Sequence, residues 1–288
     1  MSLQRVAILG PGRMGQGIGL GLFRAGWIVT LVGRAPKVPV VPLPLVVGNA
    51  SGVLDAADLI LVTTPDDGIP AAADSLAASG AVTSRQVVLH CSGRLDRSAL
   101  AVLEPSGAAL GSFHPLQTVA DPLRAPDLLR GAFAGVEGDE AAVAMAGLLA
   151  GALGMSTVVL PTGGKAGYHA AAVIIGNYIT ALVGFGERIA IEAGIPSDLA
   201  TRIYFPLLAG AVNNLGRLRP AEALTGVVRR GDLASIRAHL ETLSSDQDRV
   251  LYARLGLEAL RLAVEAGLAR EVAQQIQALF EQGLVPPP

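Results

Sequence analysis

Apolar and polar positions along the first 160 residues follow the pattern of strands separated by helices. Residues 14–25, 70–79 and 143–153 carry apolar side chains at helical spacing. Short apolar runs with the length of buried strands occur at 5–9, 27–32, 58–63, 86–90, 108–113, 132–136 and 157–160. This βαβ succession is typical of a doubly wound parallel sheet, so we predict an α/β fold of the Rossmann type.

The pattern changes after Pro161, where long helical repeats replace the short apolar runs. Helices are expected at 166–193, 198–215, 232–243, 246–265 and 269–282. We therefore predict a dinucleotide-binding Rossmann domain over residues 1–160, followed by an all-α domain over residues 161–288. Within the first domain, prolines at 36, 39, 42 and 44 predict an irregular crossover over 35–44.

Composition narrows the classes of partner. Hydrophobic residues make up 51% of the chain, charged residues 16%, and the formal net charge is −2. Since no block of like charges occurs, nucleic acid and anionic membrane surfaces are poor partners. A single cysteine, Cys91, excludes a disulfide framework, and four dispersed histidines predict no metal site. The first apolar run leads directly into a glycine-rich turn rather than a cleavage site, so a cytoplasmic location is expected.

Two uncharged stretches, 141–164 and 166–186, have the length of a membrane span of roughly 20 residues. Glycines and Pro161 divide the first into a helix and a strand. The second contains His169, Asn177 and Tyr178, which favours a helix buried inside the protein. No membrane span is therefore predicted.

A glycine motif marks a nucleotide site. Gly10, Gly12 and Gly15 match G-x-G-x-x-G, directly after the first strand and at the start of a helix. Such glycines allow a tight turn, close approach of a pyrophosphate and close helix packing, and the helix amides bind the phosphates. Arg13 and Met14 lie within the turn and are expected to contact the cofactor. A merely glycine-rich turn is the alternative.

The residues at the ends of the following strands predict which nucleotide binds. The second strand ends at Arg34 instead of the carboxylate that usually binds the ribose 2′-hydroxyl of NAD, so Arg34 is expected to bind a 2′-phosphate. We therefore predict NADP(H), with a solvated arginine as the alternative. Thr64 and Pro65 follow the strand at 58–63 and are expected to border the cofactor, or to form an ordinary turn.

Two further strands end in polar residues. After 86–90, Ser92 is expected to bind the cofactor or the substrate, whereas Cys91 is expected to be a buried thiol because it points away from His90. His114 lies at the carboxyl end of 108–113, where a substrate meets the nicotinamide. A histidine that bonds its own loop is the alternative there.

The third group of candidates begins the helical half. Lys165 and His169 are four residues apart and share a helix face, and Asn177 lies two turns further. A lysine at a helix N-terminus is unfavourable, because cations prefer the C-terminus, which suggests a role for Lys165. It can polarise a carbonyl, donate a proton or hold a carboxylate. A capping or surface lysine is the alternative.

The whole chain resembles a family of predicted NADP-dependent oxidoreductases whose helical C-terminal half is a domain of unknown function. The matching stretches are the glycine motif, 111–117, 165–172 and 224–232. The resemblance implies distant kinship to ketopantoate reductase, pyrroline-5-carboxylate reductase and β-hydroxyacid dehydrogenases. In the β-hydroxyacid dehydrogenases, a lysine on the helix that enters the second domain is followed four residues later by an asparagine. Lys165 matches this lysine, but His169 stands where the asparagine would be. The resemblance also implies a homodimer formed by the helical domains, and Ser235 and His239 as substrate contacts.

These observations predict an enzyme that reduces a C=O or C=N bond of a small, carboxylated metabolite, with ketopantoate reductase as a specific possibility. Lys165 would polarise the acceptor, and His169 or His114 would relay the proton. The alternative is an NADP-binding sensor or scaffold without catalysis, since a Rossmann fold does not fix function. Reduction of NADP by a deazaflavin partner is a third possibility.

Overall fold

A computed structural model describes residues 4–36 and 38–284 and divides the chain into two compact units, Met1–Ile179 and Thr180–Pro288. The division falls inside helix α6 (Lys165–Glu192). The predicted domain boundary at residue 160 stays a prediction. Each unit is described by itself below.

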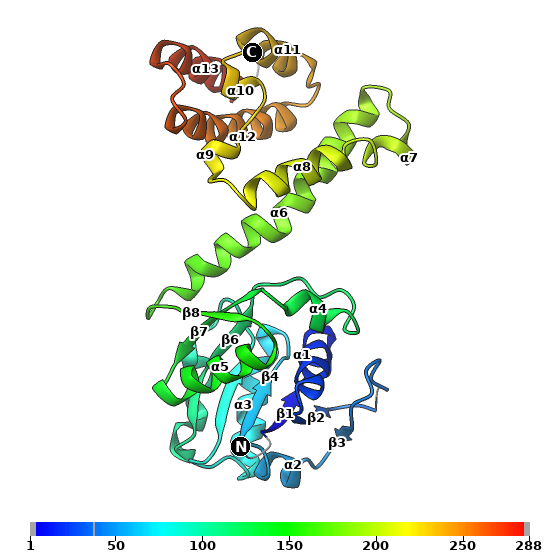
Figure 1. The fold of residues 1–288 in the computed structure, drawn as a ribbon, viewed down its shortest axis with the longest axis vertical. Coiled ribbons are helices and arrows are strands. Elements are labelled where there is room, and N and C mark those ends of the chain that lie inside the picture. The colour runs from blue at the N-terminus through cyan, green and yellow to red at the C-terminus, as the bar shows by residue number, and fades with distance from the viewer. Residues whose placement is uncertain (1–3, 37, 285–288) are drawn as a thin grey trace. The chain divides into compact units, whose positions relative to one another are not determined.

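The first unit contains an eight-stranded sheet in the order β3-β2-β1-β4-β5-β6-β7-β8 (Figure 1). This order places strands on both sides of β1, as expected for a doubly wound Rossmann sheet. The strands are β1 (Arg5–Leu9), β2 (Ile28–Gly33), β3 (Leu45–Val47), β4 (Leu59–Val62), β5 (Val87–His90), β6 (Ala109–Pro115), β7 (Phe133–Gly138) and β8 (Ser156–Val159).

One pair of strands departs from the predicted parallel sheet. Strands β6 and β7 are antiparallel, with His114 opposite Gly135, whereas the other neighbours are parallel. The connection between them holds only the five-residue helix α4 (Ala125–Leu129). Residues 116–132 return the chain beside β6 in the opposite direction, without the crossover that a parallel pair requires.

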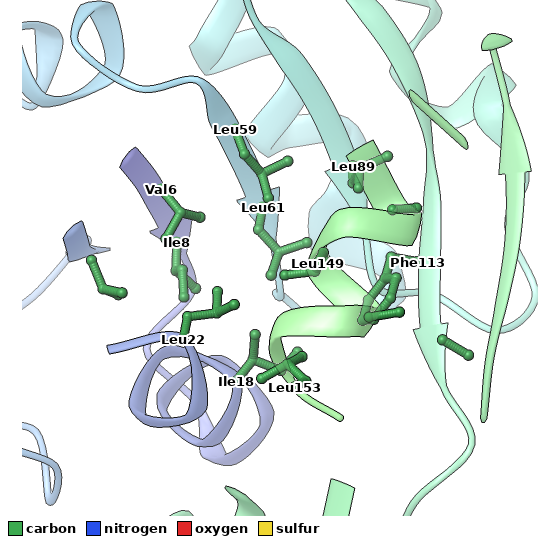
Figure 2. Close-up of a cluster of buried hydrophobic side chains, with 14 of the residues drawn as sticks. Val6, Ile8, Ile18, Leu22, Leu59, Leu61, Leu89, Phe113, Leu149 and Leu153 are labelled. Carbon is green, nitrogen blue, oxygen red and sulfur yellow. The ribbon is translucent and has the colours of Figure 1, made fainter. Parts of the chain in front are cut away.

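Helices cover both faces of the sheet because side chains alternate along each buried strand. Leu59 and Leu61 of β4 pack in a cluster with α1 (Arg13–Arg24), α4 and α5 (Glu140–Ala152), part of which is shown in Figure 2. Ile60 and Val62 point the other way, toward α2 (Ser51–Asp55), α3 (Ile69–Ser79) and the 3₁₀ helix η2 (Arg97–Ser106). Full burial of each such side chain contributes about 1.5–3 kcal/mol.

The predicted irregular crossover lies beside the glycine turn. Residues 35–36 and 38–44 contain no helix or strand, and residue 37 lies outside the described part. Gln16, which is buried in α1, donates to the carbonyl of Pro11 at 2.8 Å and accepts from the amide of Val40 at 2.7 Å. This side chain therefore fastens the crossover to the turn.

The second unit is helical and has its own core. Phe280, Ile276 and Ile236 are completely buried there. Besides the second half of α6, its helices are α7 (Ser197–Ala200), α8 (Phe205–Leu215), α9 (Pro220–Ala223), α10 (Val227–Arg230), α11 (Leu233–Thr242), α12 (Asp246–Glu265) and α13 (Arg270–Gly283). The α/β fold with a helical C-terminal half is thus confirmed. The single helix predicted over 198–215 is wrong, because Pro206 starts a new helix at α8.

Helix α6 is not the buried helix that the sequence predicted. Ile175 is 76% exposed and Ile174 is 58% exposed in the single chain. By length and composition alone, α6 is the one helix among the described residues that could cross a membrane. In the neighbouring α8, no residue is buried, and Leu207 is 73% exposed. Large apolar side chains are thus exposed on both helices, such as Ile175 on α6 and Leu207 on α8.

Candidate nucleotide and catalytic site

The carboxyl ends of β1, β2, β4 and β5 lie at one edge of the sheet, since these strands are parallel. The glycine turn begins there at Gly10, whose φ of +96° favours glycine. Its amide donates to Val32 at 3.0 Å, and its carbonyl accepts from the Thr63 hydroxyl at 2.6 Å. The turn is therefore held between the ends of β2 and β4.

The other two glycines of the motif have different surroundings. A Cβ on Gly15 would overlap the Thr63 hydroxyl and lie 2.5 Å from the Gly10 carbonyl, so α1 packs directly on the strand ends. A Cβ on Gly12 would meet nothing within 4 Å. Gly12 is the N-cap of α1, with no side-chain cap and no acidic residue in the first turn. Open space beside uncapped amides fits a pyrophosphate.

The predicted cofactor residues surround this turn. Arg13 and Arg34 are exposed, and Gly33, which precedes Arg34, lies against Pro11: a Cβ there would be 3.2 Å from the Pro11 ring. The Arg34 backbone thus starts beside the turn, and its predicted contact with a 2′-phosphate stays a prediction. Met14 is half-buried against the core, and its predicted contact with the cofactor stays a prediction.

Thr64 and Pro65 follow β4 beside the same turn. A Cβ on Gly10 would lie 2.9 Å from the Thr64 amide nitrogen. The Thr64 methyl group borders the turn as well, at 3.1 Å from the same Cβ, while the Thr64 hydroxyl is buried without a hydrogen-bond partner among the described residues. Pro65 precedes the short 3₁₀ helix η1 (Asp66–Gly68).

His90 holds the loop after β5. Its Nε2 lies 3.0 Å from the carbonyl of Asp96 and its Nδ1 accepts from the amide of Ser92 at 3.2 Å, so Nε2 carries the proton. Burial lowers the pKa of His90 to about 4. The Ser92 hydroxyl accepts from the amides of Arg94 and Leu95 at 3.1 and 2.9 Å. Ser92 therefore shapes the loop, and its predicted contact with the cofactor stays a prediction.

Lys165 is buried at the start of α6, with 3% of its surface exposed. Its ammonium donates to the Ser92 carbonyl at 2.6 Å and to the Ser112 hydroxyl at 2.9 Å. Burial lowers the pKa of Lys165, and the charge of Glu137 opposes that shift. An ammonium has three N–H groups, so one remains for a ligand. The alternative of a surface lysine is wrong.

His114 and Tyr168 form the next contact between β6 and α6. The Tyr168 hydroxyl lies 3.0 Å from His114 Nδ1 and accepts from the amide of Gly135 at 3.1 Å. A Cβ on Gly135 would lie 2.5 Å from that hydroxyl, so β7 needs glycine there. Burial and the charge of Lys165 lower the pKa of His114 to about 4, which keeps the ring neutral near pH 7.

His169 completes the cluster. Its ring lies 5.9 Å from that of His114, edge to face. A Cβ on Gly93 would overlap His169 and lie 2.8 Å from His114 Nε2, so both rings meet the loop that follows β5. The structure therefore brings together three of the predicted catalytic residues, Lys165, His114 and His169, within the first unit.

The fourth predicted catalytic residue, Asn177, is not in this cluster. It is exposed on α6, and eight residues of helix separate it from His169, a rise of about 12 Å. Its role stays a prediction. Cys91 packs against the core, and burial raises the pKa of its thiol to about 12, which favours the unreactive thiol that we expected. In the second unit, Ser235 donates its hydroxyl to Asp232 at 2.7 Å and so helps to cap α11.

Sequence reasoning assigned no role to two residues that build the site, Ser112 and Tyr168. Both had a usable signal. Ser112 is two residues from His114 on β6 and therefore shares its face. Tyr168 is three residues from Lys165 on α6, on the same helix face. Thr63 contacts Gly10, and Gly93 lies against His114 and His169; these are tertiary contacts that local spacing does not reveal.

Residues 132–259 match the family model of a domain of unknown function, DUF2520. This match confirms the predicted resemblance to a family whose helical C-terminal half has no assigned function, although it covers less than half of the chain. No curated protein matches the chain.

Several solved structures share the fold over nearly the whole chain. Protein TM1727 from Thermotoga maritima has a TM-score of 0.69 and 23% identity, covering 90% of this chain and 98% of its own. BF3122 from Bacteroides fragilis, described as a candidate NADP oxidoreductase, has a TM-score of 0.67 and 21% identity over 89% and 98%. Pyrroline carboxylate reductase from Plasmodium falciparum, solved with NADP bound, has a TM-score of 0.59 and 13% identity over 99% and 98%. The chain thus has the fold of these proteins, a Rossmann-type sheet followed by helices.

Proposed function

We propose that the protein is an NADP(H)-dependent oxidoreductase that reduces a C=O or C=N bond of a small, carboxylated metabolite. One observation carries this proposal. At the carboxyl edge of one sheet, an open glycine turn at Gly12 and the cluster of Lys165, His114 and His169 occur together. This edge is where ligands bind in open α/β sheets.

The glycine turn, the α1 amides and two exposed arginines would hold the cofactor. The amides of the first turn would bind the pyrophosphate beside Gly12. Arg34, and Arg13 from the turn itself, would bind a 2′-phosphate. Similarity to an NADP-bound reductase supports this choice of nucleotide.

The chemistry divides between the cofactor and three side chains. NADPH, held by the glycine turn with Arg13 and Arg34, would supply the hydride that the carbon of the double bond accepts. The π electrons of that bond move to its oxygen or nitrogen, where the free N–H of Lys165 stabilises the developing negative charge. That atom then takes one proton, relayed by His169 or His114. The cationic Lys165 also favours a substrate that carries a carboxylate.

Hydride transfer tests this proposal directly. Wild-type protein is mixed with NADPH deuterated at C4 and a panel of 2-oxo acids and cyclic imines, and the products are analysed by mass spectrometry. We expect deuterium in the product, and a loss of kcat of about 100-fold or more in Lys165→Met. The affinity for NADPH should change little, because Lys165 donates to Ser92 and Ser112 and not to residues of the glycine turn.

Turnover of the wild type and of Lys165→Met can be compared only if the variant folds. Methionine keeps the length of the buried side chain, and circular dichroism reports whether Lys165→Met keeps its structure. Full turnover in a folded Lys165→Met would remove Lys165 from the mechanism. Tight NADPH binding without transfer to any tested acceptor would favour the sensor or scaffold alternative.

We also propose a homodimer that forms through the helical half of the chain, in the cytoplasm. Helix α8 supports it, because none of its residues is buried although it is strongly apolar. Large apolar side chains exposed on one element mark a protein interface more often than a solvated surface. A second copy would cover both α8 and the apolar side chains of α6, which is why we prefer it to a membrane.

A further inference from the structure

Tyr168 has one hydroxyl and three polar neighbours. The amide of Gly135 donates to it at 3.1 Å, His114 Nδ1 lies at 3.0 Å, and the His114 carbonyl lies at 3.3 Å. A hydroxyl carries a single proton, so it donates either to the ring nitrogen or to the carbonyl. The choice decides which nitrogen of His114 carries the ring proton.

The distances favour donation to the ring. Hydroxyl donors form bonds of about 2.5–3.0 Å, a range that includes the ring nitrogen and excludes the carbonyl at 3.3 Å. If Tyr168 donates to Nδ1, that nitrogen is unprotonated. Because burial keeps the ring neutral near pH 7, its one proton is then on Nε2.

The protonated nitrogen points away from the tyrosine. Among the described residues, Nε2 of His114 forms no hydrogen bond, and it lies against Gly93: a Cβ there would lie 2.8 Å from it. The same Cβ would overlap His169, so both rings pack beside Gly93. Glycine at 93 allows this close approach of the two rings.

We propose that Tyr168 is a positioning residue that fixes His114 as its Nε2–H tautomer, so that this N–H donates a hydrogen bond to the acceptor atom of the substrate. Gly135 supports the arrangement by donating its amide to the same hydroxyl and by leaving room for the tyrosine ring. The inference rests on the proposed reductase function for the identity of the ligand, but not for the tautomer.

With this tautomer, His114 and His169 have different roles. A neutral imidazole that donates through Nε2–H polarises an acceptor without giving up its proton. His114 therefore acts as a fixed donor beside Lys165, and the proton relay passes to His169. This assignment deepens the proposed mechanism, which left the relay open between the two rings.

The tautomer is measured by nitrogen-15 NMR of the histidine rings at pH 7.5, with His114→Gln used to assign the signals. In the wild type we expect His114 Nε2 to have the shift of a protonated ring nitrogen and Nδ1 that of an unprotonated one. In Tyr168→Phe, the two shifts should move toward each other as the tautomers mix.

A second tyrosine–histidine pair provides the matched control. In the second unit, the Tyr252 hydroxyl lies 2.7 Å from His239 Nδ1. Tyr252→Phe should alter the signals of His239 and leave those of His114 unchanged. A wild-type His114 protonated on Nδ1, or a tautomer unchanged by Tyr168→Phe in a folded protein, would overturn the inference.

The second measurement is the reductase activity of the Tyr168→Phe variant. We expect kcat of Tyr168→Phe to fall by about five- to tenfold, the effect of misplacing one hydrogen bond, with the Kd for NADPH within about twofold of the wild type. Unchanged kcat would overturn the role of the tautomer in the reaction. A wild-type protein that has the expected tautomer but binds no NADPH would overturn the proposed function alone.

Discussion

At the residue scale, burial of ionisable groups distinguishes the candidate site from the rest of the first unit. His90 and Lys165 are buried, and His114 is largely so. In each of them burial lowers the pKa, because transfer from water disfavours the charged form. Such groups cost stability and are common at functional sites. The hydrogen bonds of Lys165 to Ser92 and Ser112 compensate for part of that cost.

The buried histidines predict how stability depends on pH. The pKa of His90 is about 4 in the folded protein and 6.5 as a reference, so between these values the unfolded chain binds more protons. The free energy of unfolding should therefore fall as the pH decreases from about 6.5 to about 4, with His90 alone accounting for about 3 kcal/mol. Urea unfolding at several pH values measures this change.

A pair of variants isolates the histidine contribution. His90→Gln removes the titrating ring and should flatten the profile between pH 6.5 and 4, whereas the exposed His239→Gln should not. Carboxylates whose pKa is lowered, such as Asp96, Asp232 and Asp248, add losses only at lower pH. Equal profiles for His90→Gln and the wild type would contradict the account.

At the element scale, the sequence predicted the long regular elements and missed the short ones. Helix α12 begins and ends as predicted, because its apolar spacing is continuous over 20 residues. The short elements β3, α2, α9 and α10 have three to five residues each, too few to show a period. The direction of β7 beside β6 cannot be read from its apolar run, which is compatible with either direction.

The candidate site shows the same division between local and tertiary information. The glycine motif, Lys165, His114 and His169 were predicted because their neighbours in sequence carry the signal. Gly135 was not, since it is the ring of Tyr168, packed on it from α6, that requires glycine there. Only the folded chain places α6 against the ends of β5, β6 and β7.

The start of α1 gives a prediction that separates binding from stability. Gly12→Ala adds a methyl group to open space, so the free energy of unfolding should stay the same or rise slightly, while the methyl blocks the pyrophosphate and NADPH binding weakens strongly. Gly15→Ala overlaps Thr63 and the Gly10 carbonyl and should destabilise the unit by about 1–3 kcal/mol. Denaturation and calorimetry on both variants measure the two effects.

The two variants serve as controls for each other. If Gly12→Ala bound NADPH as tightly as the wild type, the pyrophosphate would not lie at Gly12. If Gly15→Ala were as stable as the wild type, the close packing of α1 on the strand ends would be wrong.

At the scale of the whole molecule, the helical half predicts self-association. Phe205 and Leu207 of α8 are 63% and 73% exposed in the single chain. We expect the wild type to be a dimer by light scattering at micromolar concentration, and Leu207→Glu to shift it toward the monomer, because a buried unpaired charge is costly. Leu148→Glu, on α5 of the first unit and 58% exposed, should leave the dimer intact. A wild-type monomer would contradict this prediction.

The central claim for the whole molecule is that the carboxyl edge of its sheet binds NADP(H). The most direct test is calorimetric titration of the wild type and of Arg34→Ala with NADPH and with NADH. We predict that the wild type binds NADPH about 10- to 100-fold more tightly than NADH, as expected for hydrogen bonds between a guanidinium and a phosphate, and that Arg34→Ala loses most of this preference. Binding of neither nucleotide would contradict the reductase function itself, and equal binding of both by the wild type would contradict the role of Arg34.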